Sequence, residues 1–168
     1  TVVDSATGTP LPSANVSMTD NGLYNWNAIT DASGNFNQTI FGGTYDVGAG
    51  VWGHKEKFLP AQILGINPVT IPLPKGYYDD FFFNNNWTVS GNAATGAWQR
   101  AESVGTFLGT TPIQPDSDVA NDFGVNCFVT GNSGSTASDD DVDGGYTNLT
   151  TPAMDLTTYG LPRVSFYW

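Results

Sequence analysis

The sequence predicts an all-β protein that consists of two consecutive β-sandwiches. Its 168 residues include 20 glycines and 10 prolines, whereas lysine and arginine together number only 5. Glycine and proline favour turns, and the scarcity of strong helix formers such as Lys and Glu argues against long helices. Short runs of alternating apolar and polar residues, bounded by turn sequences, indicate strands.

Strands and turns follow one another at short intervals in the first part of the chain. Residues 14–19 alternate with the period of a strand, and residues 35–41 do the same, with Phe36 and Ile40 on one face. Four turn sequences separate such runs, at residues 5–8, 19–22, 31–34 and 41–43. This spacing over about 75 residues predicts a small sandwich, in which Asp31 and Gly34 serve only as turn formers.

The charge and the prolines place a boundary between two domains. Residues 76–168 contain 11 acidic and 2 basic side chains, a net charge of -9, out of -11 for the chain. A segment with three prolines, residues 66–76, precedes this acidic part. We therefore expect domains at 1–74 and 77–168. Both ends of the chain are strand-like, so we also expect a piece of a longer protein, with the second domain truncated at its C-terminus.

The net charge of -11 excludes the usual phosphate-binding surfaces. Binding to nucleic acid depends on cationic side chains, so neither nucleic acid nor an anionic membrane surface is an expected partner. No run approaches the ~18 apolar residues that span a bilayer, and therefore we expect no membrane insertion.

Few side chains are suited to nucleophilic or acid–base catalysis. The single cysteine, Cys127, lies in an apolar run that predicts a buried, inert thiol, and the single histidine, His54, gives only weak support for a Cys/His dyad. We expect Arg100 to form a structural ion pair with one of three carboxylates, Glu102, Asp116 or Asp118. No nucleophile elbow, zinc-binding helix or phosphate loop is present in the sequence. We therefore expect no enzymatic activity from this chain.

An acidic run in the second part resembles the first half of a calcium loop. Asp139, Asp141 and Asp143 alternate and are followed by Gly144, which permits a sharp turn. The second half of an EF-hand is missing, because Thr150 stands where a glutamate would complete the loop. Two interpretations remain: a calcium-binding loop on a β-sandwich, and a solvated acidic turn. Hard oxygen ligands would favour calcium over zinc.

The tryptophans allow a carbohydrate-binding interpretation, because flat indole rings suit the apolar faces of sugars. Trp26 is expected in an exposed loop and Trp52 beside a glycine, so these two are the candidates for contact with a ligand. The stronger interpretation is that aromatic residues supply the buried area of the sandwiches. Three further tryptophans lie in strand-like runs: Trp87, Trp98 and Trp168.

The first part resembles the carboxypeptidase regulatory-like domain. Three blocks in the family's order carry the likeness, at residues 2–16, 30–36 and 43–47. The resemblance implies a transthyretin-like sandwich of about seven strands without catalytic residues.

The second part is similar to the jelly-roll domains appended to secreted bacterial peptidases, which are akin to MAM and galactose-binding-like sandwiches. The matching blocks lie at residues 77–91, 96–100, 114–118, 127–131 and 141–152. This resemblance implies a structural calcium ion, held by the acidic loop together with Asp80 or Asp79 from the domain's first strand.

Together the two resemblances imply a noncatalytic accessory region of a secreted or cell-surface bacterial hydrolase, of the zinc carboxypeptidase kind. Its expected partners are neighbouring domains of a longer parent chain and a protein or glycan surface. The competing hypothesis is an adhesin or carbohydrate-binding module, and an enzyme in its own right has the least support. The expected location is extracellular.

Overall fold

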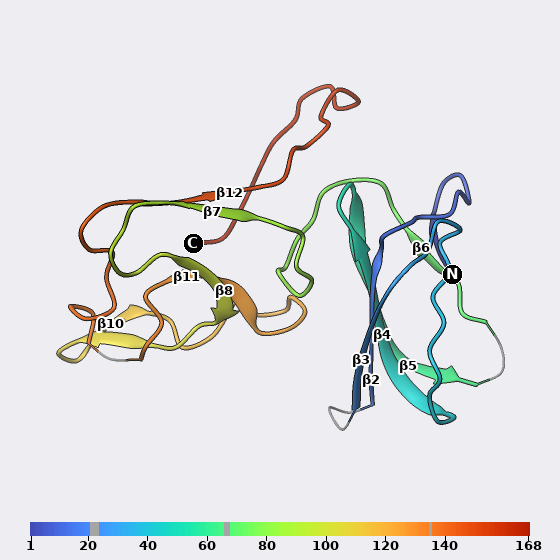
Figure 1. The fold of residues 1–168 in the computed structure, drawn as a ribbon, viewed down its shortest axis with the longest axis horizontal. Coiled ribbons are helices and arrows are strands. Elements are labelled where there is room, and N and C mark those ends of the chain that lie inside the picture. The colour runs from blue at the N-terminus through green and yellow to red at the C-terminus, as the bar shows by residue number, and fades with distance from the viewer. Residues whose placement is uncertain (21–23, 66–67, 135) are drawn as a thin grey trace. The chain divides into compact units, whose positions relative to one another are not determined.

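The computed structural model describes residues 1–20, 24–65, 68–134 and 136–168 (Figure 1). These residues form strands, turns and loops and contain no helix, so the predicted all-β class is confirmed. The structure divides into two units, Thr1–Asp79 and Asp80–Trp168. In the described ranges, no helix is long and apolar enough to span a bilayer.

The first unit is built on a four-stranded antiparallel sheet in the order β3-β2-β4-β5. Strand β2 lies inside the sheet, with Val16 opposite Ala28 of β3 and Ala49 of β4. A separate parallel pair joins β1 and β6, with Val2 opposite Ile71. The strands in the described part of this unit are β1 (Val2–Asp4), β2 (Asn15–Asp20), β3 (Tyr24–Ile29), β4 (Gly43–Val51), β5 (His54–Leu64) and β6 (Ile71–Leu73).

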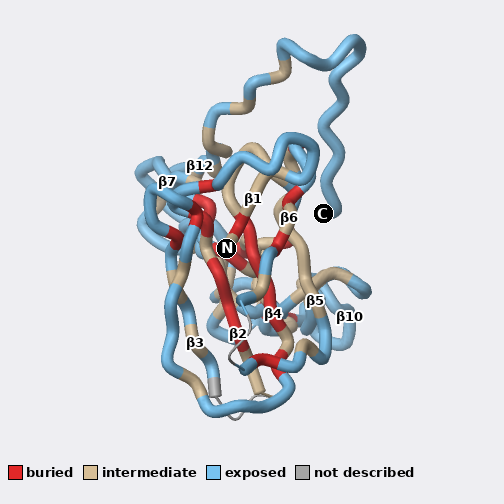
Figure 2. The backbone as a smooth tube through the Cα atoms, turned by 90° about the vertical axis from the view of Figure 1, so that its right-hand side faces the viewer, coloured by how far each residue is buried: buried red, intermediate tan, exposed pale blue. Residues whose placement is uncertain are grey.

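The hydrophobic core of the first unit lies between this sheet and the parallel pair. Val16 and Met18 of β2 and Val47 of β4 are buried, as are Val2 and Ile71 (Figure 2). Burying a Val or Ile side chain contributes about 1.5–3 kcal/mol. The strand predicted at residues 14–19 is thus confirmed, and its apolar side chains pack on the core.

The second alternating run does not form a strand. Residues 35–41 are without regular structure, although Phe36 and Ile40 are partly buried against the core. The prediction of a strand here was wrong, because alternation gives a strand only where a neighbouring backbone completes the hydrogen bonds. The preceding turn is confirmed: Asp31 Oδ1 accepts N–H bonds from Ser33 and Asn35. The turn expected at 19–22 includes Asn21 and Gly22, which lie outside the described residues.

The described residues of the second unit form three two-stranded antiparallel ladders: β8 with β11, β7 with β12, and β9 with β10. The strands are β7 (Thr88–Gly91), β8 (Trp98–Glu102), β9 (Thr106–Leu108), β10 (Thr111–Gln114), β11 (Asn126–Thr130) and β12 (Thr147–Thr150). The first strand expected in this part, near residue 80, is absent, since no strand lies between β6 and β7 in the described chain. The domain bounds 1–74 and 77–168 stay a prediction.

An aromatic cluster packs against the β8–β11 ladder. The ring of Phe81 meets Trp87 and Phe128 edge-on, at centroid distances of 5.4 and 5.2 Å. Arg100 fixes the segment that precedes β7, because its guanidinium donates hydrogen bonds to the carbonyls of Phe81 and Phe82. The predicted ion pair of Arg100 was therefore wrong, because its side chain bonds to backbone carbonyls and not to Glu102, Asp116 or Asp118.

Candidate functional site

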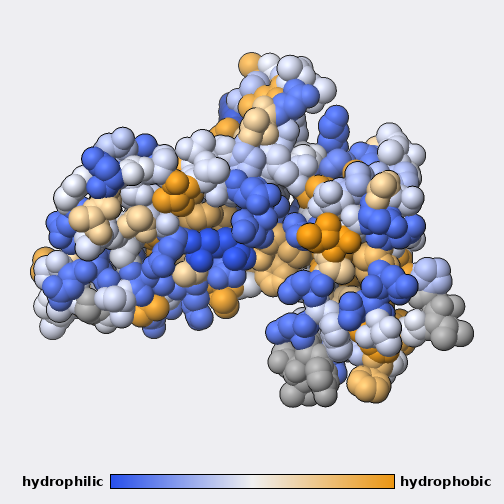
Figure 3. All heavy atoms as spheres, in the orientation of Figure 1, coloured by the Kyte–Doolittle hydropathy of each residue, from blue (hydrophilic) through white to orange (hydrophobic). Residues whose placement is uncertain are grey.

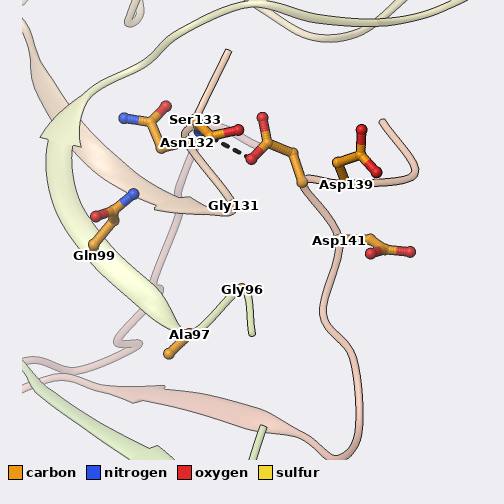
Figure 4. Close-up of a pocket in the computed structure, with 9 residues that line it drawn as sticks. Gly96, Ala97, Gln99, Gly131, Asn132, Ser133, Asp139 and Asp141 are labelled. Carbon is orange, nitrogen blue, oxygen red and sulfur yellow. Dashed lines mark hydrogen bonds between the residues drawn. The ribbon is translucent and has the colours of Figure 1, made fainter. Parts of the chain in front are cut away.

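The acidic loop lies between β11 and β12 and forms one side of a shallow hollow in the second unit (Figure 4). The hollow has a volume of about 430 Å³. Its other side is formed by residues at the ends of β8 and β11. The lining residues are Gly96, Ala97, Gln99, Gly131, Asn132, Ser133, Asp139, Asp140 and Asp141.

Two of the three predicted loop ligands line this hollow, and the third lies beyond it. Asp139 Oδ2 accepts a hydrogen bond from the Thr136 hydroxyl at 2.8 Å. The carboxylates of Asp139 and Asp141 point away from Gln99 in Figure 4. Asp143 is exposed and does not line the hollow, and its backbone carbonyl accepts the N–H of Ala94.

The loop carboxylates are not gathered around one point. In the part of the chain that the structure describes, no group of three ligand atoms within 4.8 Å of one another includes Asp139, Asp141 or Asp143. Asp140, which the alternating pattern passes over, instead accepts a hydrogen bond from the Ser133 N–H at 2.9 Å. Calcium ligation by the alternating carboxylates would therefore require the loop to close, and it stays a prediction.

Glycines allow the loop backbone to pack closely on the neighbouring turns. Gly131 and Gly96 have φ values of +64° and +70°. A Cβ atom at Gly131 would collide with the carbonyl oxygen of Asp140, and one at Gly96 with that of Asp141. The position of the acidic loop therefore depends on the absence of side chains at these two positions.

Asp80 lies outside the hollow, and its carboxylate accepts hydrogen bonds from backbone N–H groups. Its side chain is 5% exposed, and its two oxygens accept the N–H groups of Phe82 and Phe123, each at 3.2 Å. Burial raises the pKa of the nearby Asp122, and the charges of Asp118 and Asp80 raise it further. These contacts give Asp80 a structural role, in which it joins the segment before β7 to the segment before β11.

In the first unit, polar side chains that are far apart in the sequence come together. His54 Nε2 lies 3.0 Å from Asp4 Oδ2, and the N–H groups of Ala6 and Thr7 donate to the other oxygen of Asp4. The hydrogen bond with His54, followed by these N–H donors, lowers the pKa of Asp4 to about 2. Carboxylate oxygens of Glu56 and Asp79 lie within 4.8 Å of each other. Glu56 was not among the predicted site residues, because its position in β5 between Lys55 and Lys57 gave no signal of this proximity.

The thiol of Cys127 is unsuited to nucleophilic attack. Cys127 lies in β11, is half-buried, and its Sγ is 3.7 Å from the Ala101 carbonyl oxygen. Burial raises the pKa of this thiol, and the charges of Asp118 and Asp122 raise it further. Since the thiolate is the reactive form, these surroundings favour the inert thiol that the sequence predicts.

The tryptophan candidates for ligand contact are integrated into the fold. Trp26 lies in β3, packs against the core, and meets the Tyr45 ring edge-on at 5.7 Å, so its predicted place in an exposed loop was wrong. Trp52 is half-buried and lies 5.2 Å from the Tyr77 ring. In contrast, Trp168, predicted to be buried in a strand, is fully exposed and outside any strand.

No protein-family model matches the chain, and no curated protein matches it.

Proposed function

We propose that this chain is a noncatalytic accessory region of a secreted or cell-surface bacterial hydrolase, of the zinc carboxypeptidase kind. One observation carries this proposal: the side chains best suited to catalysis make structural contacts within the fold. His54 pairs with Asp4, Arg100 holds two backbone carbonyls, and the pKa of the Cys127 thiol is raised. The resemblance of both parts to domains of secreted peptidases supplies the class of parent enzyme and the extracellular location.

The accessory role predicts that removal of this region changes the rate of hydrolysis of large substrates but not that of small ones. A region that supports folding or holds a protein substrate leaves the chemistry on a short peptide unchanged, because it does not touch the reacting atoms. The test compares the parent hydrolase with a version that lacks this region. We expect equal kcat/KM on a short peptide and a lower rate on a folded protein substrate. Peptidase activity of residues 1–168 alone would contradict the proposal.

We further propose that the acidic loop binds calcium for structural purposes. Its donor set fits a hard cation, because the carboxylates of Asp139, Asp141 and Asp143 provide only oxygen. Asp80 is not included among these ligands, because its carboxylate already accepts hydrogen bonds from two backbone N–H groups. The ion would draw the loop carboxylates together and reduce their mutual repulsion.

A carbohydrate-binding module is the second candidate, and the hollow of the second unit favours it. The amide of Gln99, a group that can both donate to and accept from sugar hydroxyls, is among its lining side chains. A glycan array with the wild-type chain and with Gln99→Ala tests this candidate. Selective binding that Gln99→Ala abolishes and Trp26→Ala preserves would favour the module over the accessory role.

A further inference from the structure

One pair of neighbouring residues in the second unit is suited to a reaction within the backbone. Asp143 is followed by Gly144, and this is the one Asp-Gly pair in the sequence. Glycine has no side chain that would hinder the approach of its backbone nitrogen to the preceding carboxyl group. The one Asn-Gly pair, residues 21–22, lies outside the described residues.

Both reacting groups of this pair lack a hydrogen bond. In the described chain, no donor is bonded to the Asp143 carboxylate, and the Gly144 N–H has no acceptor. In contrast, the carboxylates of Asp116 and Asp139 accept hydrogen bonds. Asp143 and Gly144 are also exposed, and much of the surface in Figure 3 is hydrophilic. No bond therefore holds the two groups apart, and water reaches both.

We propose that Asp143–Gly144 is a modification site, at which Asp143 of the folded chain isomerises to isoaspartate without an enzyme. The Gly144 nitrogen attacks Cγ of the Asp143 carboxyl group and forms a C–N bond. A C–O bond breaks, and the hydroxyl leaves as water together with the N–H proton. The product is a five-membered cyclic imide. One water molecule then opens the ring, so the two steps together need no other reactant.

The fold directs the second step towards isoaspartate. Water that attacks Cγ restores aspartate, whereas water that attacks the main-chain carbonyl carbon of Asp143 gives isoaspartate. The oxygen of this main-chain carbonyl accepts the N–H of Ala94 at 2.8 Å. Such a donor stabilises the negative charge that develops on a carbonyl oxygen during attack. Ring opening at the main-chain carbonyl is therefore favoured.

Isomerisation changes the connection between the acidic loop and β12. The main chain of isoaspartate runs through Cβ and Cγ and is one atom longer, and the former main-chain carbonyl becomes a carboxylate. The bond from Ala94 to the main chain at residue 143 is thereby lost. Asp143 is also a proposed calcium ligand, so the experiments below contain chelator, and their outcome does not depend on the calcium proposal.

The first experiment compares the folded chain with the chain unfolded in guanidinium, both incubated at 37 °C and pH 6. An endoproteinase that cleaves before aspartate but not before isoaspartate then reports the reaction. Aspartate at 143 gives the fragment 143–154, and isoaspartate gives 141–154. Because folding leaves the two groups unbonded, we expect the fragment 141–154 to form in the folded chain within about threefold of the unfolded rate.

Asn132 is the internal control, because Asn-Ser is also a labile pair but here it is held by hydrogen bonds. Its side chain bonds to the Glu102 carbonyl and the Val104 N–H, and the Ser133 N–H donates to Asp140. We expect folding to slow the deamidation of Asn132 at least tenfold, as read from tandem mass spectra. Isomerisation of Asp143 that folding slows as much as it slows Asn132 would overturn the proposal.

Two variants test the cyclic imide. Asp143→Asn forms the same ring with loss of ammonia, which leaves more readily than hydroxide, so we expect conversion at least tenfold faster than in the wild type. The folded variant is expected to give a larger share of isoaspartate than the unfolded one. Asp143→Glu keeps the charge but requires a six-membered ring, and we expect its Tm to survive incubation while that of the wild type falls. A stable Asp143→Asn chain, equal shares in both states, or an equal fall in Tm for Asp143→Glu would contradict the mechanism.

Discussion

At the scale of single residues, the pairing of Asp4 with His54 makes a prediction about acid stability. The pKa of Asp4 falls from 3.8 to about 2 in the folded chain, chiefly through the hydrogen bond with His54. Because the folded value is the lower one, this interaction stabilises the protein above about pH 4 and is lost as the pH falls towards 2. We expect His54→Ala to raise the pKa of Asp4 towards its usual value, as measured by NMR titration of the carboxyl carbon.

The control for this prediction is Lys55→Gln, which removes a positive charge from the next residue. The pKa of Asp4 is expected to change less in this variant, because hydrogen bonding with His54, rather than general positive charge, is the largest cause of the shift. The same acid titration curve for His54→Ala and the wild type would contradict the assignment.

The raised pKa of Cys127 predicts slow chemical modification. Burial is the larger cause of the shift, and the charges of Asp118 and Asp122 come after it. We expect iodoacetamide to alkylate the folded chain at least tenfold more slowly than the urea-unfolded chain at pH 8, because only the thiolate reacts. Asp118→Asn is expected to accelerate the folded reaction only slightly. Equal rates in the two states would show that the thiol is accessible and reactive.

Local residue patterns were predictable from the sequence, but most polar partners were not. The Asp31 turn follows from neighbouring residues. In contrast, Asp4 meets His54 across 50 residues, and Arg100 bonds to carbonyls 18 and 19 residues away. A backbone carbonyl has no signature in a side-chain pattern, so the sequence suggested carboxylates as the partners of Arg100.

At the scale of elements, the acidic loop packs on glycines, so a side chain added at one of them is expected to destabilise the second unit. Gly131→Ala combines a strained positive φ with a collision between the new Cβ and the Asp140 carbonyl. Gly109→Ala is the matched control, since Gly109 has a similar φ of +63° in the same unit but nothing within 4 Å of the Cβ position. Strain alone costs about 1 kcal/mol. We expect Gly131→Ala to destabilise the second unit by at least ~1 kcal/mol more than the control, as measured by urea unfolding.

Equal losses of stability in the two glycine variants would contradict the close packing of the loop. NMR chemical shifts give an independent check. If the loop packs on Gly131, Gly131→Ala displaces it, and we expect the largest changes in chemical shift at Asp139 and Asp141. In the control these signals are expected to keep their wild-type positions.

Strand prediction succeeded where the alternating run is paired on both sides and failed where it is not. Residues 14–19 correspond to β2, which lies between β3 and β4. Residues 35–41 alternate equally well, but in the described structure no ladder includes them. Trp26 was assigned to an exposed loop, yet β3 pairs along its whole length with β2. Pairing is a long-range property, which periodicity within one run does not contain.

At the scale of the whole molecule, the two units differ in how much of their apolar surface is buried. Among the described residues, the core cluster of the first unit comprises 11 buried apolar side chains, whereas Phe83 and Val129 are the buried ones of the second. The second unit also has the larger share of negative charge, with Glu102 and nine aspartates from Asp80 onward. A small core combined with acidic self-repulsion leaves the second unit more dependent on bound ions and partners for its stability.

The calcium proposal therefore predicts a selective effect on thermal unfolding. An ion that binds only the folded state at 100 times its Kd adds about 2.7 kcal/mol, and each kcal/mol raises the Tm of a unit this size by about 4–8 °C. We expect calorimetry of the whole chain to show one transition that moves up by roughly 10–20 °C with calcium and returns with chelator. The transition that stays in place is assigned to the first unit with Val16→Ala, which weakens the core of that unit.

Asp141→Ala is expected to remove the calcium effect and Asp118→Ala, outside the loop, to preserve it. Identical melting curves with calcium and with chelator would leave a solvated acidic turn as the correct description of Asp139–Asp143.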